Sequence, residues 1–429
     1  MNTLETREKF ISFFRKCGHK YFPQSKIYND DPTLFFVNSG MCQFKNHILG
    51  LTKPTSGNEN YVNYQVCIRA GGKHNDFDDV GKDSYHLTCF EMLGFWNLNG
   101  LAHKKGAIEI AYRFLTEECG LEKDRLYVTY FAGNETIPSD EETLDSWKEI
   151  VSVDKIIKGN FKDNFWMMAE NGPCGVCTEI HYDTIGGRDA SELVNKDDPT
   201  VIEIWNIVFI QYNKIGEEYE ALGKLYVDTG MGMERLSMIL QKKKSLYTTD
   251  VFRPLISYAQ ILSNAEPYTD TFDKLSPFYI NDVSYRIFAD HIRTCVIALF
   301  QGLNFGCFNR EFILRKIFRR MMMHMYLYLY NTIVKPTMNQ QVIKALISHI
   351  LSHFLWFQHD VEDIQKKLVE EEKLYIGKLY NIKTKYLKHT KKSSNIDSVI
   401  RKLRETEGID SMFIPYINTL TFDVGDIMK

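Results

Sequence analysis

The hydrophobic pattern of the chain changes near residue 250, and this change limits the possible folds more than any other feature. Before it, short segments rich in β-branched and aromatic residues are mixed with helical ones; after it, long helical periods dominate. The strand-like segments recur without regular β–α–β alternation, which favours an antiparallel sheet with helices packed on it. We therefore predict an α+β domain over residues 1–245 and an all-α domain over residues 246–429, with the boundary near residues 242–247.

The clearest single helix is expected close to the start of the chain. Residues 3–17 place an apolar stripe on one face, with Thr3 as the expected N-cap and Gly18 suited to a left-handed C-terminal cap. The stripe consists of Phe10, Ile11, Phe13, Phe14 and Cys17. Strands are predicted over residues 33–37, 62–69, 84–93 and 203–213, and helices of the second half over residues 289–301, 309–330 and 361–387.

Composition excludes several classes of protein. With 429 residues and 44% hydrophobic side chains, the chain can bury more than one core. Its opening segment, MNTLETREKF, lacks an apolar signal core, and no run approaches the roughly 18 apolar residues that span a bilayer. Nine cysteines, closely spaced only at Cys174 and Cys177, fit reduced thiols better than a disulfide framework. We expect a soluble, cytoplasmic protein.

Basic residues gather in two places, although the net charge is only −3. This net charge excludes a polycation that coats nucleic acid without discrimination. Residues 378–404 hold nine Lys or Arg residues and a single acid, Asp397. The second group consists of Arg310, Arg315, Lys316, Arg319 and Arg320. Taken alone, such groups are more often solvated helix faces than binding sites.

The loop at residues 70–83 joins two predicted strands whose side chains suit a nucleotide. In extended segments, Cys67 and Arg69 share one face, and so do His86, Thr88, Phe90 and Met92. Arg69 can bind a phosphate with paired donors, Phe90 can stack on a base, and a glycine-hinged loop carries Lys73 and His74. A polar β-hairpin with a mobile tip explains the same spacing equally well.

The segment VDTGMGMERL, residues 227–236, predicts a strand end, a glycine turn and a helix start. Gly230 and Gly232 permit a tight turn, and Arg235 would fall in the first helical turn, where anions are attracted. The pattern lacks both the Rossmann spacing and the P-loop ending, so it is weak by itself. Asp228 is either a turn residue or a carboxylate that holds an ammonium group.

Together these segments carry a family resemblance. Five of them, in this order, resemble the catalytic core of the alanyl-tRNA synthetases, which are class II enzymes: CIRAGGKHNDFDDVG, HLTCFEMLG, DNFWMMAENGPCGVCTEI, EIWNIVFIQYN and VDTGMGMERL. DPTLFFVNSGMCQFKNHILG, FADHIRTCVIALFQG and NREFILRKIFRR agree as well. The similarity spans nearly the whole chain and is weakest over residues 330–429. It implies a class II antiparallel sheet core in residues 1–245, flanked by helices, and a helical domain for the tRNA acceptor stem in residues 246–429.

The resemblance implies an ATP site and two catalytic arginines. Arg69 would bind the α-phosphate and stabilise the pentavalent transition state, and Phe90 would sandwich adenine against Arg235. Lys73 and His74 would reach the phosphates or the tRNA end. Met92 and Gly232 complete the expected ATP site. No general base is needed if the alanine carboxylate attacks the α-phosphorus in line, and Mg²⁺ is expected on the phosphates.

The resemblance also implies an alanine pocket. Asp228 would bind the α-ammonium group and Gly230 would allow close approach. Asn206 and Val208 alternate onto one face of their strand, where the family builds the pocket, and Trp166 would close over the methyl group. The single C-x-x-C of Cys174 and Cys177 does not make a zinc site, so we assign no metal ligand in the protein.

For tRNA, the family uses an asparagine before a basic helix to read a G·U wobble pair in the acceptor stem, and Asn309 matches that position. Arg310, Arg315 and Arg319 would then bind phosphates, which replaces the solvated-face interpretation for this helix. The partnering aspartate is assigned to Asp423, with Asp426 as the alternative.

Some segments depart from the family pattern. Phe95 replaces an asparagine beside the nucleotide strand, and Glu170 and Asn171 replace Asp and Thr, which concerns substrate affinity more than reaction type. His349 and His353 give an HxxxH, but no cysteine follows them, so the metal-dependent editing domain does not fit. We expect no hydrolysis of mischarged seryl-tRNA, and a monomer.

The function predicted from the sequence is that of an alanine–tRNA ligase. The alternatives are a synthetase-like paralogue that hands its adenylate to another acceptor, and a tRNA-binding regulatory module without aminoacylation. The paralogue would lack the basic helix, and the module would lose Arg69 or Arg235. Both arginines are present.

Overall fold

The computed structural model describes residues 1–29, 34–52, 59–71, 75–100, 102–330, 333–334, 338–354, 360–391, 396–407 and 421–422. The chain divides into two compact units. The first comprises Met1–Asp78 and Asp83–Asp250, and the second comprises Asp79–Lys82 and Val251–Lys429. A short piece of the loop at residues 70–83 therefore belongs to the second unit.

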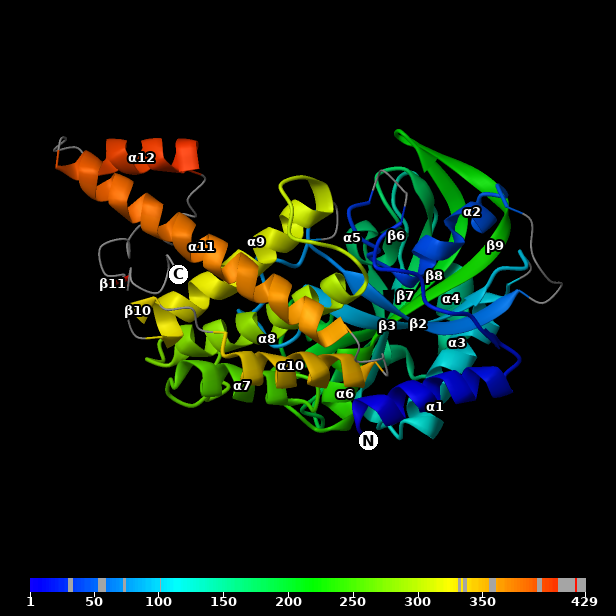
Figure 1. Cartoon of the computed structure of the whole chain (residues 1–429). Coiled ribbons are helices and arrows are strands. Elements are labelled where there is room, and N and C mark those ends of the chain that lie inside the picture. The colour runs from blue at the N-terminus through cyan, green and yellow to red at the C-terminus, as the bar shows by residue number, and fades with distance from the viewer. Residues whose placement is uncertain are drawn as a thin grey trace. The chain divides into compact units, whose positions relative to one another are not determined.

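A mixed sheet forms the centre of the first unit. Within the described residues it has nine strands in the order β1-β2-β3-β9-β8-β7-β4-β5, with β6 paired to β7 (Figure 1). The strands are β1 Lys20–Tyr21, β2 Asn60–Ile68, β3 Cys89–Asn97, β4 Leu126–Phe131, β5 Ile156–Gly159, β6 Phe165–Met167, β7 Gly172–Asp183, β8 Val201–Ile215 and β9 Glu218–Gly232. Along the sheet from β2 to β4, each neighbouring pair is antiparallel: β2–β3, β3–β9, β9–β8, β8–β7 and β7–β4. This confirms the predicted antiparallel core. In the described part of this sheet, only the edge pairs β1–β2 and β4–β5 are parallel.

Helices flank this sheet. They are α1 Thr3–Lys16, α2 Lys45–Ile48, α3 Lys104–Arg113, α4 Glu141–Lys148, α5 Phe161–Asn164 and α6 Met233–Leu240. Short 3₁₀ or π turns are η1 Gly40–Phe44, η2 Phe114–Glu118, η3 Lys123–Arg125, η4 Val153–Lys155, η5 Ser191–Leu193 and η6 Leu246–Thr248. Figure 1 shows α1 and α3 on one face of the sheet and α2 on the other.

Helix α1 covers the first face with aromatic side chains. Phe14 stacks on Phe95 of β3 with ring centroids 4.6 Å apart, and Phe10 lies 5.9 Å from Trp205 of β8. The N-cap is Asn2, which accepts from the Glu5 backbone N–H while the Glu5 carboxylate accepts from the Asn2 N–H. The helix thus begins one residue earlier than expected, since Thr3 lies inside it.

The C-terminal cap and the apolar stripe of α1 agree only partly with the prediction. Gly18 has φ of +88°, as expected for a left-handed cap. Cys17, however, is exposed, because the helix ends at Lys16 and Cys17 forms its C-cap. The apolar stripe therefore ends at Phe14.

Alternation along β3 separates the two faces of the sheet. Glu91 and Phe95 point toward α1, where Glu91 pairs with the buried Arg7 at 2.6 Å. Met92 and Trp96 point to the opposite face and pack in a hydrophobic cluster with η1 and α2. The functional side chains described below lie on this second face.

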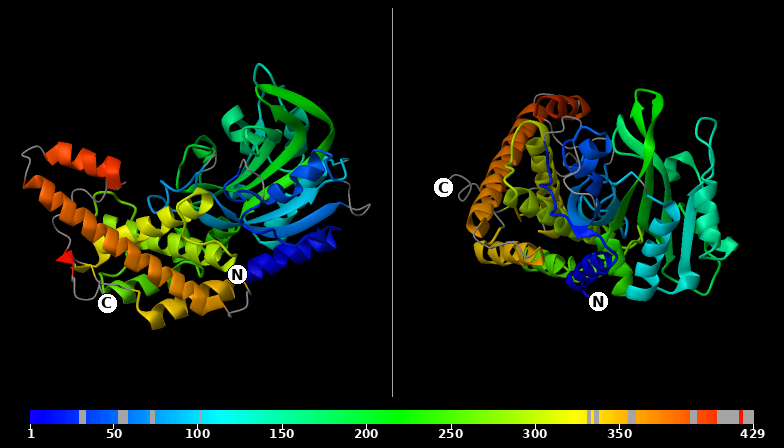
Figure 2. Two further views of the ribbon diagram at one scale, coloured as in Figure 1. Left: turned by 45° about the horizontal axis from the view of Figure 1, so that its top comes forward. Right: turned by 90° about the vertical axis from the view of Figure 1, so that its right-hand side faces the viewer.

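The two longest strands form a hairpin. β8 and β9 are joined by residues 216–217, and Gly216 has φ of +61°, which a tight hairpin turn requires. In Figure 2 this hairpin, coloured green, extends beyond the neighbouring strands.

Two predicted strands are confirmed and two predictions need correction. β2 and β8 cover the segments predicted at residues 62–69 and 203–213. β3 begins only at Cys89, because residues 84–88 are bends and irregular backbone; the Arg69 N–H still donates to the Thr88 carbonyl at 2.9 Å, just beyond the paired strands. Residues 34–37 are not a strand. Val37 there makes only two isolated backbone bonds, donating to Ile27 O at 2.8 Å and accepting from Ile68 N at 2.9 Å.

The predicted glycine turn at residues 230–232 is also wrong. β9 continues through Gly232 and α6 starts at the next residue, and neither Gly230 nor Gly232 has a positive φ. Gly230 is instead required for space, as described below, whereas an added Cβ at Gly232 would meet no close contact.

The second unit is mainly helical. Its elements are α7 Arg253–Ser263, α8 Tyr279–Phe300, α9 Asn309–His324, η7 Met325–Leu329, α10 Gln340–His353, α11 Val361–Thr390, α12 Ile396–Glu407 and the short pair β10 Ile333–Val334 and β11 Thr421–Phe422. The helices predicted at residues 289–301, 309–330 and 361–387 are present, although the second ends in a π turn. α8 is buried over residues 282–299 and is the central helix of this unit. Among the described residues, no helix combines the length and apolar character needed to cross a membrane.

Candidate active site

A pocket opens on the second face of the sheet in the first unit. It encloses about 530 Å³ of space not filled by protein atoms, part of it open to solvent. The lining residues come from the ends of β2, β3, β8 and β9, from the loop between β2 and β3, and from α6: Arg69, Asp76, Tyr85, Leu87, Phe90, Met92, Glu203, Ile204, Gly230, Gly232, Glu234 and Arg235.

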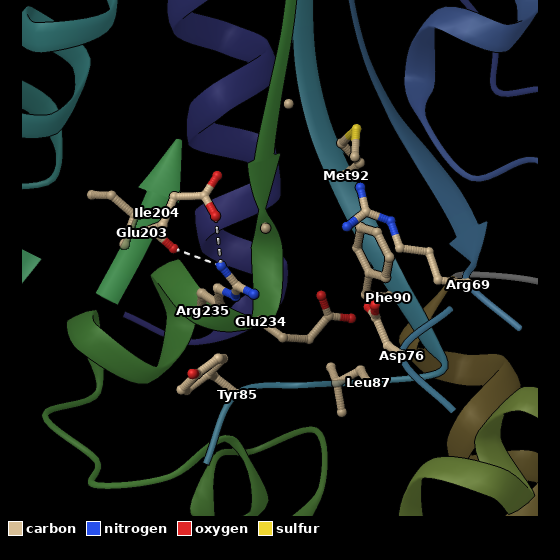
Figure 3. Close-up of a pocket in the computed structure, with 12 residues that line it drawn as sticks. Arg69, Asp76, Tyr85, Leu87, Phe90, Met92, Glu203, Ile204, Glu234 and Arg235 are labelled. Atoms are coloured by element: carbon tan, nitrogen blue, oxygen red, sulfur yellow. Dashed lines mark hydrogen bonds and ion pairs between the residues drawn. The ribbon is translucent and has the colours of Figure 1, made fainter. Parts of the chain in front are cut away.

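The two arginines singled out in the sequence lie in this one pocket, on opposite sides of it (Figure 3). Arg69 follows β2, and its guanidinium lies 5.0 Å from the centroid of the Phe90 ring. Arg235 lies in the first turn of α6, with its guanidinium 5.2 Å from the centroid of the Tyr85 ring. Each guanidinium therefore rests on an aromatic face, which fixes its plane.

Polar contacts occupy only part of each guanidinium. Arg69 Nε donates to the Asn38 carbonyl at 3.4 Å. Arg235 Nη1 donates to the Glu203 carbonyl at 2.9 Å and lies 3.2 Å from its carboxylate. Among the described residues no other hydrogen bond engages these two groups, so donors on both arginines remain for an anion.

Close packing beneath the pocket explains one of the two glycines. A Cβ at Gly230 would lie 2.8 Å from Met92 Sδ, whose sulfur also accepts from the Gly40 N–H at 3.3 Å. Any side chain at residue 230 would displace Met92. At Gly232 a Cβ would meet nothing closer than Arg235, at 3.5 Å. The close packing at Gly230 is thus with Met92, and the expected approach of alanine to Gly230 stays a prediction.

Acidic groups surround Arg235. Burial alone raises the pKa of Glu203, but the positive charges of Arg235, His181 and Arg69 outweigh it and leave the pKa lowered. Glu179 is more deeply buried, and burial raises its pKa despite the hydrogen bond from His181 at 3.2 Å. Glu203 is therefore the ionised partner of the pocket arginines.

The residues expected around alanine also come together, because the β8–β9 register aligns them. Asn206 pairs with Gly230, and Val208 pairs with Asp228. Val208 belongs to the hydrophobic cluster of the second face, and Trp166 packs against that cluster from β6.

Asp228 is a buried carboxylate. It accepts from Trp96 Nε1 at 2.5 Å, and burial raises the pKa of Asp228 to about 7 despite this hydrogen bond. The buried Asn206 Oδ1 has no hydrogen-bond partner among the described residues, while its Nδ2 donates to Glu179 at 3.5 Å. An ammonium group would satisfy both oxygens.

The family of this chain follows from a comparison with known protein families. The model of the family "tRNA synthetases class II (A)" matches residues 5–412. The chain belongs to this family. The match covers both units, and the mixed sheet with its flanking helices is accordingly the class II synthetase fold.

Three relatives of this class II chain are alanine–tRNA ligases. The enzyme of Candida albicans is 43% identical over 383 residues, covering 86% of this chain and 38% of that protein. The mitochondrial enzyme of Saccharomyces cerevisiae is 48% identical over 322 residues, covering 73% and 33%. The cytoplasmic enzyme of Dictyostelium discoideum is 41% identical over 410 residues, covering 92% and 42%. The chain thus spans between a third and about two fifths of the length of these relatives.

Several lining residues of the synthetase pocket were not identified from the sequence. They are Asp76, Tyr85, Leu87, Glu203, Ile204 and Glu234. Most of them stand next to residues that were identified: Glu203 opens the EIWN segment and Glu234 precedes Arg235. Glu234 is buried, and both its oxygens accept from the Glu91 N–H, at 3.1 and 3.0 Å, so it joins α6 to β3.

Two departures from the family pattern lie outside the pocket lining. Phe95 is fully buried on the opposite face of the sheet, against Phe14, so the aromatic ring belongs to the core beneath α1. Asn171 accepts from the Gly216 N–H at 2.7 Å and joins the start of β7 to the hairpin turn. Glu170 is exposed. The expected effect of these differences on substrate affinity stays a prediction.

Four residues assigned to ligands lie outside the described residues: Lys73, His74, Asp423 and the alternative Asp426.

The predicted tRNA residues of α9 are described in the second unit. Asn309 is exposed and begins α9 with φ of +50°, a left-handed conformation that asparagine tolerates better than most residues. Arg310 is half-buried beside it. Arg315 and Arg319 both pair with the carboxylate of Glu371 in α11, at 3.2 Å and 2.8 Å.

The cysteine and histidine motifs do not form a metal centre in the described part of the chain, where no group of three or more His, Cys, Asp or Glu residues could hold an ion. Cys174 and Cys177 are buried thiols in β7, and burial raises the pKa of Cys177 well above its ordinary value. His349 and His353 lie in α10, where the His349 ring is 6.4 Å from that of Tyr258.

Proposed function

We propose that the chain activates alanine with ATP and transfers the alanyl group to the 3′ end of an alanine tRNA. One observation carries this proposal: Arg69 and Arg235 line the same pocket, and Gly230 lines it too. Gly230 pairs with Asn206 across β8 and β9, and Val208 pairs with Asp228 beside them, so the proposed alanine residues adjoin the pocket. The proposal further assigns residues 1–245 to aminoacylation and residues 246–429 to acceptor-stem recognition. The alanine–tRNA ligases among the relatives support the choice of amino acid.

In the activation step, an oxygen of the alanine carboxylate attacks the α-phosphorus of ATP. A new P–O bond forms as the bond to the β-phosphate oxygen breaks, and pyrophosphate leaves with the electron pair. Arg69 binds the α-phosphate, and Arg235 and Phe90 hold the adenine and ribose end, with Met92 and Gly232 beneath. Catalysis is therefore positioning and charge stabilisation, without a general base.

The amino acid is bound beside this pocket. The Asp228 carboxylate and the unsatisfied Asn206 oxygen accept from the α-ammonium group. Val208 and Trp166 enclose the methyl group, and Gly230 admits the substrate backbone. In the transfer step, the terminal ribose hydroxyl of the tRNA attacks the alanyl carbonyl, and AMP leaves.

The pocket lining contains carboxylates of the kind that bind magnesium. Asp76 and Glu203 are carboxylates in the lining, and a hard cation bound by triphosphate oxygens needs only one or two protein carboxylates. Glu203 is the better candidate, because its pKa is lowered. The ion would neutralise charge on the departing pyrophosphate.

The helical unit supplies the proposed tRNA contacts. Asn309 presents its amide at the exposed start of α9, where it would read the wobble pair, and Arg310, Arg315 and Arg319 would follow the phosphates. Asp423 is the proposed second reader of that pair. Lys73 and His74 are proposed to reach the phosphates or the tRNA end.

A second candidate is favoured by one observation. Arg315 and Arg319 are already paired with Glu371, an arrangement that suits a structural role for both arginines. If these arginines do not bind tRNA phosphates, the chain forms alanyl-adenylate without loading tRNA. We place the protein in the cytoplasm in either case; the relatives include both cytoplasmic and mitochondrial enzymes.

Exchange of labelled pyrophosphate into ATP tests the activation step. With alanine we expect exchange, with serine and glycine much less, and with Arg69→Ala a loss of about 10³-fold in the alanine-dependent rate. Exchange that is absent from the wild-type chain, or is unchanged in Arg69→Ala, would contradict the proposal. Charging of alanine tRNA, compared with a tRNA whose wobble pair is changed to G·C, then separates the two candidates.

A further inference from the structure

Residues 79–82 belong to the helical unit although the chain on both sides belongs to the sheet unit. They form a turn in which Lys82 N donates to Asp79 O at 3.0 Å, and Val80 is fully buried. The segment is short, so its position is fixed by what it contacts in the helical unit.

Arg286 of α8 holds the Gly81 carbonyl. Its Nε donates to that oxygen at 2.8 Å, its Nη1 donates to the Thr271 carbonyl at 2.9 Å, and its carbon Cζ lies 4.1 Å from the centroid of the Phe272 ring. Arg286 is completely buried. Burying a guanidinium costs free energy, and its hydrogen bonds to the two carbonyls offset that cost. The guanidinium and the two carbonyls are therefore expected to stay together.

Gly81 itself fits only as glycine. Its φ is +90°, and a Cβ there would lie 2.8 Å from Ile287 Cγ1 and 3.1 Å from the Val283 carbonyl. The backbone of the segment is therefore packed directly on α8.

Arg320 of α9 holds the neighbouring carbonyl. Its Nη2 donates to Val80 O at 3.4 Å, and its Nη1 lies 3.2 Å from Nε2 of the buried His291. His291 Nδ1 in turn lies 2.7 Å from the Asp290 carboxylate. With Nδ1 donating to Asp290, Nε2 accepts from Arg320, so the aspartate and histidine orient the arginine.

We propose that Arg286 and Arg320 are positioning residues for the ATP site: they fix the Val80 and Gly81 carbonyls and thereby the loop that carries Asp76, Tyr85 and Leu87 into the nucleotide pocket. Asp76 is three residues before the held segment, and Tyr85 is three residues after it. Tyr85 is also the ring on which Arg235 rests. The proposal rests on the proposed function only in naming ATP as the ligand.

Loosening this loop lowers affinity for the nucleotide more than for alanine. The nucleotide pocket includes Tyr85 and Leu87, whereas the proposed alanine residues lie on β6, β8 and β9. Removing one hydrogen bond from a charged donor corresponds to about a tenfold change in an equilibrium. A merely structural role would instead lower the melting temperature without separating the two substrates.

Two variants of the full chain test the proposal against a matched control. Arg320→Gln removes the charged donor to Val80, and Gly81→Ala disturbs the carbonyl held by Arg286. Gly18→Ala is the control, because Gly18 has nearly the same φ of +88° but no atom within 4 Å of an added Cβ. We expect both test variants to raise the KM for ATP in pyrophosphate exchange about tenfold, with the KM for alanine within about twofold. Gly18→Ala should leave both constants unchanged.

Amide hydrogen exchange gives a readout that does not need activity. Peptides covering residues 75–88 should exchange faster in Arg320→Gln and Gly81→Ala than in wild type or Gly18→Ala, at a temperature where all remain folded. Unchanged exchange of these peptides, or equal changes in the two KM values, would overturn the proposal. A wild-type chain without alanine-dependent activity would refute the proposed function instead, and the peptide result would still decide the role of the arginines.

Discussion

Two arginines, Arg235 of the pocket and Arg319 of α9, differ in the burial of the carboxylate that each contacts. Arg235 pairs with Glu203, whose side chain is 36% exposed, whereas Arg319 pairs with Glu371, whose side chain is 2% exposed. The arginine side chains themselves are almost equally exposed, at 23% and 24%. The exposure of the arginine therefore does not separate the role proposed for Arg235 from a structural role of Arg319; we propose that the burial of the partner carboxylate does.

The physical reason is the cost of separating the pair. A half-exposed carboxylate can exchange its arginine for water when an anion binds, at little cost. A buried carboxylate that loses its arginines remains charged in a poorly solvated place. Glu371 receives both Arg315 and Arg319, so α9 and α11 are held together by a pair that is hard to open.

The largest effect is expected from breaking the buried pair. Glu371→Ala leaves two guanidinium groups against a packed helix, and we expect it to destabilise the helical unit by about 3–5 kcal/mol. Because about 2–4 °C accompanies each kcal/mol in a unit of this size, the melting temperature should fall by roughly 6 °C or more. Glu203→Ala is the matched change in the pocket and should cost less than about 1 kcal/mol. Similar melting temperatures for the two variants would contradict the comparison.

The second effect concerns activity. Arg235→Ala should lower the second-order rate constant for pyrophosphate exchange, kcat/KM, by about 10²–10³-fold, the usual effect of removing one preorganised donor, with little change in melting temperature. If the pair with Glu371 is structural, as in the second candidate, Arg319→Ala should do the reverse, leaving exchange within about twofold and lowering the melting temperature. If Arg319→Ala is as stable as wild type but fails to charge tRNA, the proposed phosphate role of Arg319 holds and the distinction drawn from Glu371 is wrong.

The sequence predicted the sheet and the identity of the pocket arginines, but not what each arginine contacts. The strands β2 and β8 follow from segments rich in β-branched and aromatic residues. The arginine partners do not follow, because Glu203 is 32 positions from Arg235 and Glu371 is 52 positions from Arg319. Nothing local in the sequence distinguishes these two carboxylates.

Register shows the same limit. The β8–β9 hairpin is recognisable, and Ile215 pairs with Glu218 beside its turn. Regular counting from that pair would place Val208 opposite residue 225. An irregularity between Ile210 and Tyr212 shifts the register, so that Val208 lies opposite Asp228. The alanine-side residues were identified through family motifs, since their juxtaposition depends on an irregularity that the local pattern does not indicate.

Asp228 provides a smaller effect that depends on pH. Its pKa is raised to about 7, so in the folded chain it is mostly protonated below pH 7, and only the ionised form attracts the alanine ammonium group. We expect kcat/KM for alanine to fall about tenfold per pH unit below 7. Asp228→Asn should raise the KM for alanine at pH 8 and remove this dependence. A flat profile in the wild type between pH 6 and 8 would contradict the assignment.

The same group predicts an opposite trend in stability. Because the pKa is higher in the folded than in the unfolded chain, the folded state binds the proton more tightly, and stability from Asp228 is complete only below its ordinary pKa of 3.8. That stability is lost as the pH rises through about 7. Asp228→Asn, which is always neutral, should therefore gain stability relative to wild type between pH 5 and pH 8, which thermal melts at both values would measure.

The smallest effect separates two reasons for the asparagine at position 309. Its φ of +50° gives a conformational reason, and the proposed reading of the wobble pair gives a chemical one. Asn309→Gly keeps the conformation and removes the amide, whereas Asn309→Ala removes both. If the amide reads the base pair, both variants should lose charging by about tenfold or more while exchange with alanine is kept. If the backbone is the reason, Asn309→Gly should charge like wild type and only Asn309→Ala should lose stability, by roughly 1 kcal/mol. Charging and melting of the two variants side by side would then decide whether α9 is a reading helix or, like Arg319 and Glu371, a structural one.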